Sequence, residues 1–191
     1  MTVKSLKFAV LLASAFWAVL RPGTGTNKSI FFVIHILFVC LGNICRSPLA
    51  QGVFEKKVNE WGWQEAVYAD SAGVGSWHIG STPHSGSRAV AQNHQVSIDH
   101  QRARQVSSSD NHEFHYFIAM DKENARSLKE EFGIDSSKVF LMRHFDPVDR
   151  GSSVPDPYGH GVDHFDEVFM ILDRCMDEFG QFLRKNHPEL P

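Results

Sequence analysis

The chain has 191 residues, of which 19 are Lys or Arg and 22 are Asp or Glu, and its formal net charge is −3 at pH 7. This length suits one domain with a sizeable core. The sequence has neither a basic patch nor a long run of like charges, which argues against nucleic acid as a partner.

The N-terminal part of the chain, residues 1–29, is predicted to be an extension that precedes the folded domain at residues 30–191. Lys4 and Lys7 stand before an uncharged run, residues 8–20, in an order similar to the charged and apolar regions of a signal peptide. As a helix this run would be about 20 Å long, whereas the hydrocarbon core of a bilayer is roughly 30 Å thick. Three interpretations stay open: an extension with no catalytic role, a targeting or membrane-anchoring segment, and a misassigned translation start.

The most informative segment follows an apolar run, Ile34–Val39, that is typical of a buried parallel strand. Ser47 then has the character of an N-cap, and Pro48 that of the first residue of a helix that continues to Glu60. The seven residues from Cys40 to Arg46 therefore form a tight loop between a strand and a helix. Its N–H groups converge where the helix N-terminus already favours anions, which predicts a phosphate-binding loop.

The remaining elements alternate along the chain. In chain order they are a strand at Val67–Asp70, a helix at Thr82–His94, a strand at Phe114–Met120, a helix at Asp121–Phe132, a strand at Lys138–Met142 and a long amphipathic helix at His164–Lys185. This alternation predicts an α/β three-layer sandwich with a central parallel four-stranded sheet. Ligands of such sheets bind at the carboxyl ends of the strands, which is where Cys40 falls.

The residue types in the loop suit the chemistry of a phosphate monoester. Cys40 can attack as a thiolate, which the helix N-terminus, Arg46 and the Ser47 hydroxyl stabilise. The planar guanidinium of Arg46 can hold phosphate oxygens bidentately. Gly42 and Asn43 tolerate backbone conformations that other residues avoid. A nucleotide-binding P-loop is rejected, because it requires Gly-Lys followed by Ser or Thr and no Lys stands there.

The string from Cys40 to Pro48 resembles the active-site loop of the low-molecular-weight protein tyrosine phosphatases. The resemblance extends from about Ile34 to the C-terminal helix. It rests on further motifs in the same order, namely Asp70-Ser71-Ala72-Gly73, Trp77-His78-Ile79-Gly80, Ala103-Arg104-Gln105-Val106, Met120-Asp121, Pro155-Asp156-Pro157-Tyr158 and Phe165-Asp166-Glu167-Val168.

The resemblance implies a protein-tyrosine phosphatase that works without cofactor or metal through a cysteinyl-phosphate intermediate. Its substrate would be a phosphotyrosine-containing protein. Cys40 would be the nucleophile, Arg46 the phosphate-binding cation and Asp156 the general acid. The phosphate would be held by the loop, that is by Leu41, Gly42, Asn43, Ile44, Cys45 and Ser47.

Supporting roles also follow from the resemblance. Ser71 would donate or accept a hydrogen bond with Asn43 and hold the loop, while His100 and Asp121 would pair as a brace behind it. Trp77 and Tyr158 would form the wall of the cleft against the substrate ring. Gly159 stands where many eukaryotic members carry a second Tyr, so the peptide preference of those members is not carried over.

Alternative functions are a protein-arginine phosphatase, an arsenate reductase of the same fold, and a phosphotyrosine-binding module without turnover. Ile44 argues against the first, where a small Thr is usual, and the intact Asp-Pro-Tyr motif argues against the second. A pure binding module would need neither Cys40 nor Asp156.

The Cys and His residues indicate where in the cell the protein works and whether it binds a metal. Cys40 and Cys45 lie within one loop and could form a disulfide, which would inactivate the enzyme in an oxidising compartment, so a cytoplasmic location is expected. Cys175 is predicted to be a core residue.

The 11 His residues form no recognisable zinc pattern with carboxylates or cysteines, and no metal is expected. The oligomeric state is left open.

Overall fold

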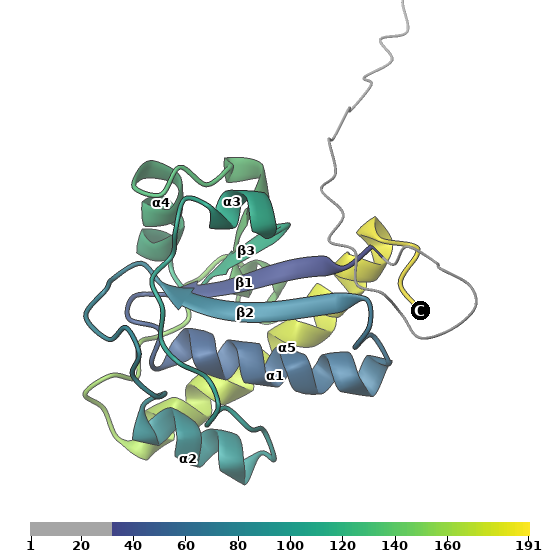
Figure 1. The fold of residues 1–191 in the computed structure, drawn as a ribbon. Coiled ribbons are helices and arrows are strands. Elements are labelled where there is room, and N and C mark those ends of the chain that lie inside the picture. The colour runs from purple at the N-terminus through teal and green to yellow at the C-terminus, as the bar shows by residue number, and fades with distance from the viewer. Residues whose placement is uncertain (1–31) are drawn as a thin grey trace, which may run out of the picture. The chain divides into compact units, whose positions relative to one another are not determined.

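Four parallel strands form the central sheet, in the order β2-β1-β3-β4 (Figure 1). The computed structural model describes residues 32–191, and residues Val33–Pro191 form one unit. The predicted extension at residues 1–29 and its apolar run at residues 8–20 lie outside the described residues. The predicted α/β sandwich with a four-stranded parallel sheet is confirmed.

The strands are β1 (Ile34–Cys40), β2 (Val67–Gly73), β3 (Tyr116–Ala119) and β4 (Val139–Leu141). β2 is longer than the predicted Val67–Asp70, because its backbone stays in register with β1 as far as the pair Cys40 and Gly73. The last residues of β2 include polar ones, so no apolar run indicates that the strand continues. Strand pairing therefore brings the end of β2 directly beside the first residue of the loop.

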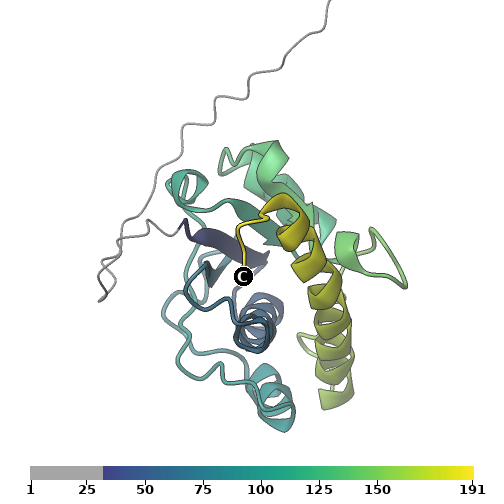
Figure 2. The same ribbon diagram turned by 90° about the vertical axis from the view of Figure 1, so that its right-hand side faces the viewer.

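Helices cover the two faces of the sheet (Figures 1 and 2). α1 (Arg46–Trp61), α2 (Ser85–Asn93) and α5 (Val162–Asn186) lie on one face, and α3 (Asp110–Glu113) and α4 (Lys122–Glu130) lie on the other. None of the helices described in residues 32–191 is both long and apolar enough to cross a membrane.

Alternation along β1 divides the core between these two faces. Leu37 and Val39 belong to a buried cluster with Phe117 and Leu128, on the α4 side. Phe38 points to the other face, where its ring lies 5.4 Å from that of Phe54 on α1 and 6.5 Å from that of Phe179 on α5. Burying each such side chain stabilises the fold by roughly 1.5–3 kcal/mol. The strand that carries the loop is thus packed on both sides.

Four helices begin at other residues than predicted; the last of them, α5, begins at Val162 rather than His164. α1 starts at Arg46, so Ser47 is not its N-cap and lies in the first turn, where its hydroxyl contacts the loop. α2 starts at Ser85, not at Thr82, and its N-cap is His84, whose ring nitrogen accepts a hydrogen bond from the backbone N–H of Gly86. Asp121 caps α4 rather than beginning it, since its carboxylate accepts from the N–H of Asn124 at 2.7 Å.

Three short elements are absent from the sequence prediction, namely α3 and the 3-10 helices η1 (Ser136–Lys138) and η2 (Met142–Phe145). Each has only three or four residues, which is too few for a helical apolar repeat to show.

A buried carboxylate joins η2 to α5. Asp146 is fully buried and follows η2 directly. Its carboxylate accepts hydrogen bonds from Arg143 Nε at 2.8 Å and from Arg174 Nε and Nη2 at 2.9 and 2.8 Å. The Arg174 bonds hold the pKa of Asp146 well below its usual range, although burial acts in the opposite direction. Asp146 is therefore ionised in the folded protein at neutral pH.

Candidate active site

The loop between β1 and α1 folds around the sulfur of Cys40. The backbone N–H of Asn43 points to this sulfur at 3.3 Å, and the Ser47 hydroxyl lies 3.1 Å from it. Asn43 takes a left-handed conformation, with φ of 54°. Gly42, in contrast, has no positive φ. Its lack of a side chain matters for another reason, since a Cβ there would lie 3.0 Å from the ring of His78.

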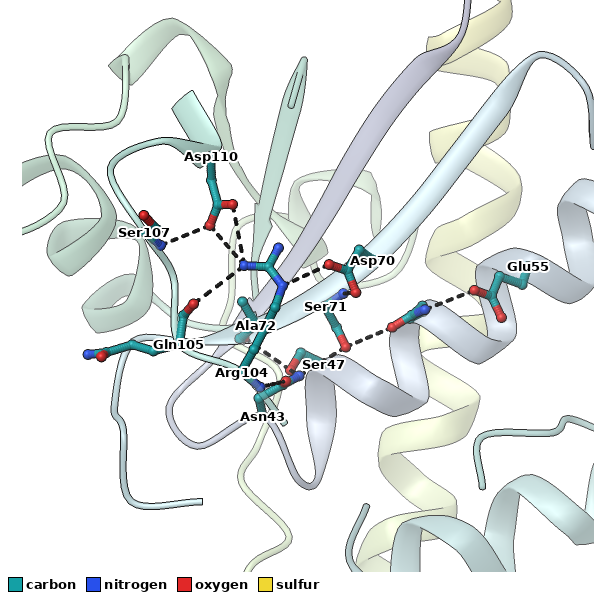
Figure 3. A network of polar contacts seen from close by, with 11 residues as sticks. Asn43, Ser47, Glu55, Asp70, Ser71, Ala72, Arg104, Gln105, Ser107 and Asp110 are labelled. Carbon is teal, nitrogen blue, oxygen red and sulfur yellow. Dashed lines mark hydrogen bonds and ion pairs between the residues drawn. The ribbon is translucent and has the colours of Figure 1, made fainter. Parts of the chain in front are cut away.

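The side chain of Asn43 holds the loop in this shape (Figure 3). Its Nδ2 donates to the hydroxyl oxygens of Ser47 and Ser71, both at 2.9 Å, and its Oδ1 accepts from the N–H of Arg104 at 2.9 Å. Both amide protons and the amide oxygen of this buried side chain are hydrogen-bonded, which explains how a non-glycine residue keeps a strained φ. The hydrogen bond between Asn43 and Ser71 that the resemblance implied is present.

The segment after β2 supports the loop from the outside. The N–H groups of Val74 and Gly75 donate to the carbonyls of Cys40 and Leu41, at 3.0 and 2.8 Å. Gly73 is required here, because a Cβ would lie 2.9 Å from the carbonyl oxygen of Leu41. Arg104, whose N–H binds Asn43, is itself fixed by ion pairs with Asp70 and Asp110 at 2.8 and 3.0 Å (Figure 3).

Arg46 lies at the opposite end of the loop, with its guanidinium 4% exposed and held between two carboxylates. Nη1 donates to Asp121 Oδ2 at 2.7 Å and to the carbonyl of Val154 at 3.2 Å, while Nη2 donates to Asp156 Oδ2 at 3.0 Å. Burial lowers the pKa of Arg46, but Cys40, Asp156 and Asp121 together outweigh burial, and the pKa lies above its ordinary value. Arg46 is therefore a fixed cation next to the sulfur.

The structure thus brings Cys40, Arg46 and Asp156 together, although Asp156 is far from Cys40 in the sequence. The Asp156 side chain is 44% exposed, so water can reach it. Its second oxygen, Oδ1, accepts from the N–H of Tyr158 at 3.2 Å, which holds the carboxylate on its own loop.

The predicted pairing of His100 with Asp121 is wrong. Asp121 is bound to Arg46 and to the start of α4, whereas His100 is exposed and its charge interacts with Glu55 and Asp99. No hydrogen bond or ion pair joins the two residues anywhere in residues 32–191. Asp121 nevertheless belongs to the site, because it positions the guanidinium of Arg46.

A pocket of about 160 Å³ opens above the sulfur. Its lining comprises Cys40, Leu41, Gly42, Ile44, Cys45, Arg46, Trp77, His78, Asp156 and Tyr158. Trp77 and Tyr158 are 73% and 58% exposed, so their rings stand at the entrance as an apolar wall. His78 was not predicted as a site residue; its adjacency to Trp77 in the sequence gave no signal of its own.

Two further thiols differ from Cys40 in their surroundings. Burial raises the pKa of the Cys45 thiol to about 12, and the charges of Cys40 and Asp156 act in the same direction. Cys175 is fully buried in the core, and burial raises its pKa to about 12. Both stay neutral thiols near pH 7, so Cys40 is the thiol placed for nucleophilic chemistry.

The arrangement can bind a tetrahedral oxyanion and transfer its central atom to sulfur. The Cys40 sulfur, a buried guanidinium and the N-terminus of α1 converge on one pocket, and a carboxyl group stands at its mouth. Residues 32–191 contain no group of three His, Cys, Asp or Glu side chains that could hold a metal ion.

Comparison with known proteins gives one family. Residues 35–189 match the family model described as low molecular weight phosphotyrosine protein phosphatase. The chain is 42% identical over 155 residues to the low molecular weight protein-tyrosine-phosphatase YfkJ of Bacillus subtilis, covering 80% of this chain and 97% of the relative. It is 34% identical over 161 residues to the low molecular weight protein-tyrosine phosphatase A of Mycobacterium tuberculosis, covering 81% and 97%. The crystal structure of YfkJ superposes with a TM-score of 0.76 and 36% identity, covering 86% of this chain and 99% of that one.

Proposed function

The chain belongs to the low-molecular-weight phosphotyrosine protein phosphatase family, and on that premise we propose that it hydrolyses phosphotyrosine in proteins through a cysteinyl-phosphate intermediate. The observation that carries the proposal is the convergence of the Cys40 sulfur, the Arg46 guanidinium and the Asp156 carboxyl group on one pocket.

In the first step, Cys40 attacks phosphorus as a thiolate while the phosphorus–oxygen bond to the tyrosine breaks. Arg46 and the N–H groups of the loop hold the non-bridging oxygens, whose charge they offset in the transition state. Asp156 gives its proton to the leaving phenolate oxygen. Its contact with Arg46 at 3.0 Å places this carboxyl group close to the bound phosphoryl group.

In the second step, water attacks the phosphorus of the cysteinyl-phosphate and the phosphorus–sulfur bond breaks. Asp156, now a carboxylate, takes a proton from this water, so one residue serves as acid and then as base. The Ser47 hydroxyl, 3.1 Å from the sulfur, stabilises the departing thiolate.

The entrance of the pocket favours an aromatic substrate. The exposed rings of Trp77 and Tyr158 can pack against the phenol ring of phosphotyrosine, and Ile44 adds an apolar contact from the loop. A phosphoserine side chain is too short to bring phosphorus to the sulfur and also use these rings. A cytoplasmic location and any membrane contact through residues 8–20 stay predictions.

The test is a steady-state assay of the purified protein on matched peptides that carry phosphotyrosine, phosphoserine or phosphoarginine, with arsenate reduction assayed in parallel. We expect kcat/KM for phosphotyrosine to exceed that for the other two peptides by about 100-fold or more. Phosphoserine is too short to use the aromatic wall, and Ile44 in the pocket lining takes the room that the guanidinium of phosphoarginine would need. Equal or greater activity on phosphoarginine, or thiol-dependent arsenate reduction alone, would overturn the proposal.

The acid role of Asp156 has its own test in Asp156→Ala. We expect kcat for phosphotyrosine to fall by about 10²–10³-fold, since a phenolate of high pKa must then leave unprotonated. The decrease in kcat for a substrate with a very acidic leaving group, such as a dinitrophenyl phosphate, should be much smaller. Measurement of kcat over a series of aryl phosphates checks this; an equal loss across the series would remove Asp156 from the acid role.

A further inference from the structure

Behind the loop, a line of hydrogen bonds leads from Glu55 on α1 through Ser71 and Asn43 to Ser47 (Figure 3). The Ser71 hydroxyl donates to Gln51 Oε1 at 2.8 Å, and Gln51 Nε2 donates to Glu55 Oε1 at 2.9 Å. Gln51 and Ser71 are buried, at 7% and 4% exposure, and neither lines the pocket. No motif of the sequence pointed to Gln51.

The chemistry of the groups fixes the direction of each bond in this line. A carboxylate only accepts, so Gln51 turns its NH₂ group to Glu55 and its carbonyl oxygen to Ser71. Ser71 has one hydroxyl proton and gives it to Gln51. Its oxygen is then left to accept from the amide of Asn43, at 2.9 Å.

The same direction continues to the nucleophile. Asn43 gives its two amide protons to the oxygens of Ser71 and Ser47. Because the Ser47 oxygen already accepts from Asn43, its own proton is free to point to the sulfur of Cys40 at 3.1 Å or to the carbonyl of Ala72 at 3.3 Å. A thiolate is the stronger acceptor of the two, so it draws this proton.

We propose that Gln51 is a positioning residue of the reaction, which keeps the Ser71 proton away from Asn43 and thereby keeps the Ser47 proton directed at the sulfur of Cys40. The inference rests on the proposed function, since it concerns activation of the same nucleophile. Without Gln51 as acceptor, the Ser71 proton must find another oxygen, and a turn of the Asn43 amide would offer it Oδ1. Nδ2 and Oδ1 would then exchange places, and the Ser47 proton would turn from the sulfur to Asn43.

The test variant is Gln51→Met, which keeps the size of the side chain and removes the amide. The readouts are kcat/KM for a phosphotyrosine peptide and the pH dependence of Cys40 alkylation by iodoacetamide, followed by mass spectrometry. Cys45 and Cys175 do not compete, because burial raises the pKa of each to about 12. The charged and titratable groups around the sulfur, Arg46, Asp156 and His78, stay unchanged in the variant.

We expect the alkylation profile of Gln51→Met to move to higher pH, and both kcat/KM and the alkylation rate near pH 6 to fall about tenfold, the effect of one charge-assisted hydrogen bond of the weaker kind. The matched control is Gln101→Met. Gln101 is also 7% exposed, but neither polar atom of its amide has a hydrogen-bond partner within residues 32–191. This control should follow the wild type in both readouts.

A second pair of variants distinguishes an effect of hydrogen-bond direction at residue 51 from an effect of side-chain packing. Gln51→Glu alone sets two carboxylates at hydrogen-bond distance and should impair both readouts. The double variant Gln51→Glu/Glu55→Gln restores the pattern, because the new Gln donates and the new Glu still accepts from Ser71. We expect it to recover to within about threefold of the wild type.

A wild-type alkylation profile in Gln51→Met would overturn the inference, since the Arg104 N–H would then orient Asn43 by itself. An equal loss in the single and double glutamate variants would also overturn it, and this pair decides if Gln51→Met does not fold. Both failures leave phosphotyrosine hydrolysis by the wild type intact. Absence of that hydrolysis would instead reject the proposed function, while the alkylation comparison would still report on Cys40.

Discussion

Cys40→Ser should reduce turnover of a phosphotyrosine peptide by on the order of 10⁴-fold or more, because the serine hydroxyl is not ionised near neutral pH and is a poor leaving group from phosphorus. Affinity for inorganic phosphate should persist, since the Arg46 guanidinium and the loop N–H groups are unchanged. Turnover is measured by steady-state assay, and phosphate affinity by calorimetric titration.

The matched control for this variant is Cys175→Ser. Cys175 is fully buried on α5 and does not line the pocket. Activity per folded molecule should stay near the wild-type value, although the fold loses stability. Residual hydrolysis near the wild-type rate in Cys40→Ser would reject Cys40 as the nucleophile. Loss of phosphate binding together with turnover would show that the substitution collapsed the loop.

Asp146→Asn is expected to have the largest effect on stability, at about 3 kcal/mol of unfolding free energy at pH 7. The fully buried carboxylate accepts from both Arg143 and Arg174. An amide would leave Arg174 without its ion-pair partner and Arg143 with the exposed Asp149 alone. The pKa of Asp146 lies well below its ordinary value of 3.8 in the folded state. Its contribution is therefore complete above about pH 4 and falls as the pH drops below that value.

Urea unfolding of the wild type and of Asp146→Asn, each at pH 7 and at pH 3, measures this dependence. The wild type should exceed the variant in unfolding free energy by less at pH 3 than at pH 7. Asp149→Asn is the matched control. Asp149 pairs with the same Arg143 at 2.8 Å, but its side chain is 53% exposed. Its loss should cost less than about 1 kcal/mol. A similar cost for both substitutions would mean that burial of Asp146 does not decide its contribution.

The sequence predicted the features that depend on local chemistry. The apolar run of β1, the Cys-to-Arg loop and the Asp-Pro-Tyr motif are each visible within a few residues, and the structure brings Cys40, Arg46 and Asp156 to one pocket. The alternation of strands and helices predicted the sheet. Periodicity alone could not set the boundaries, because Ser47 serves the loop with its hydroxyl instead of capping α1.

The partners of polar side chains could not be predicted in the same way. His100 and Asp121 were paired by resemblance, yet Asp121 binds Arg46 and His100 interacts electrostatically with Glu55. Gln51 and Asp146 gave no signal, since an amide in a helix and a carboxylate after a short 3-10 turn are ordinary in sequence. Their importance comes from burial and from partners that only the tertiary structure supplies.

The position of Arg46 in the first turn of α1 has a consequence for how mutation could alter the substrate preference of this enzyme. The floor of the pocket is part of a strand and a helix that pack into the core, and its amide and guanidinium groups are tied by hydrogen bonds on several sides. The exposed rings of Trp77 and Tyr158 take no part in these hydrogen bonds. Mutation of residues at the rim can therefore alter which phosphoproteins bind. The residues that carry out phosphoryl transfer beneath the rim depend on one another and cannot be exchanged one at a time.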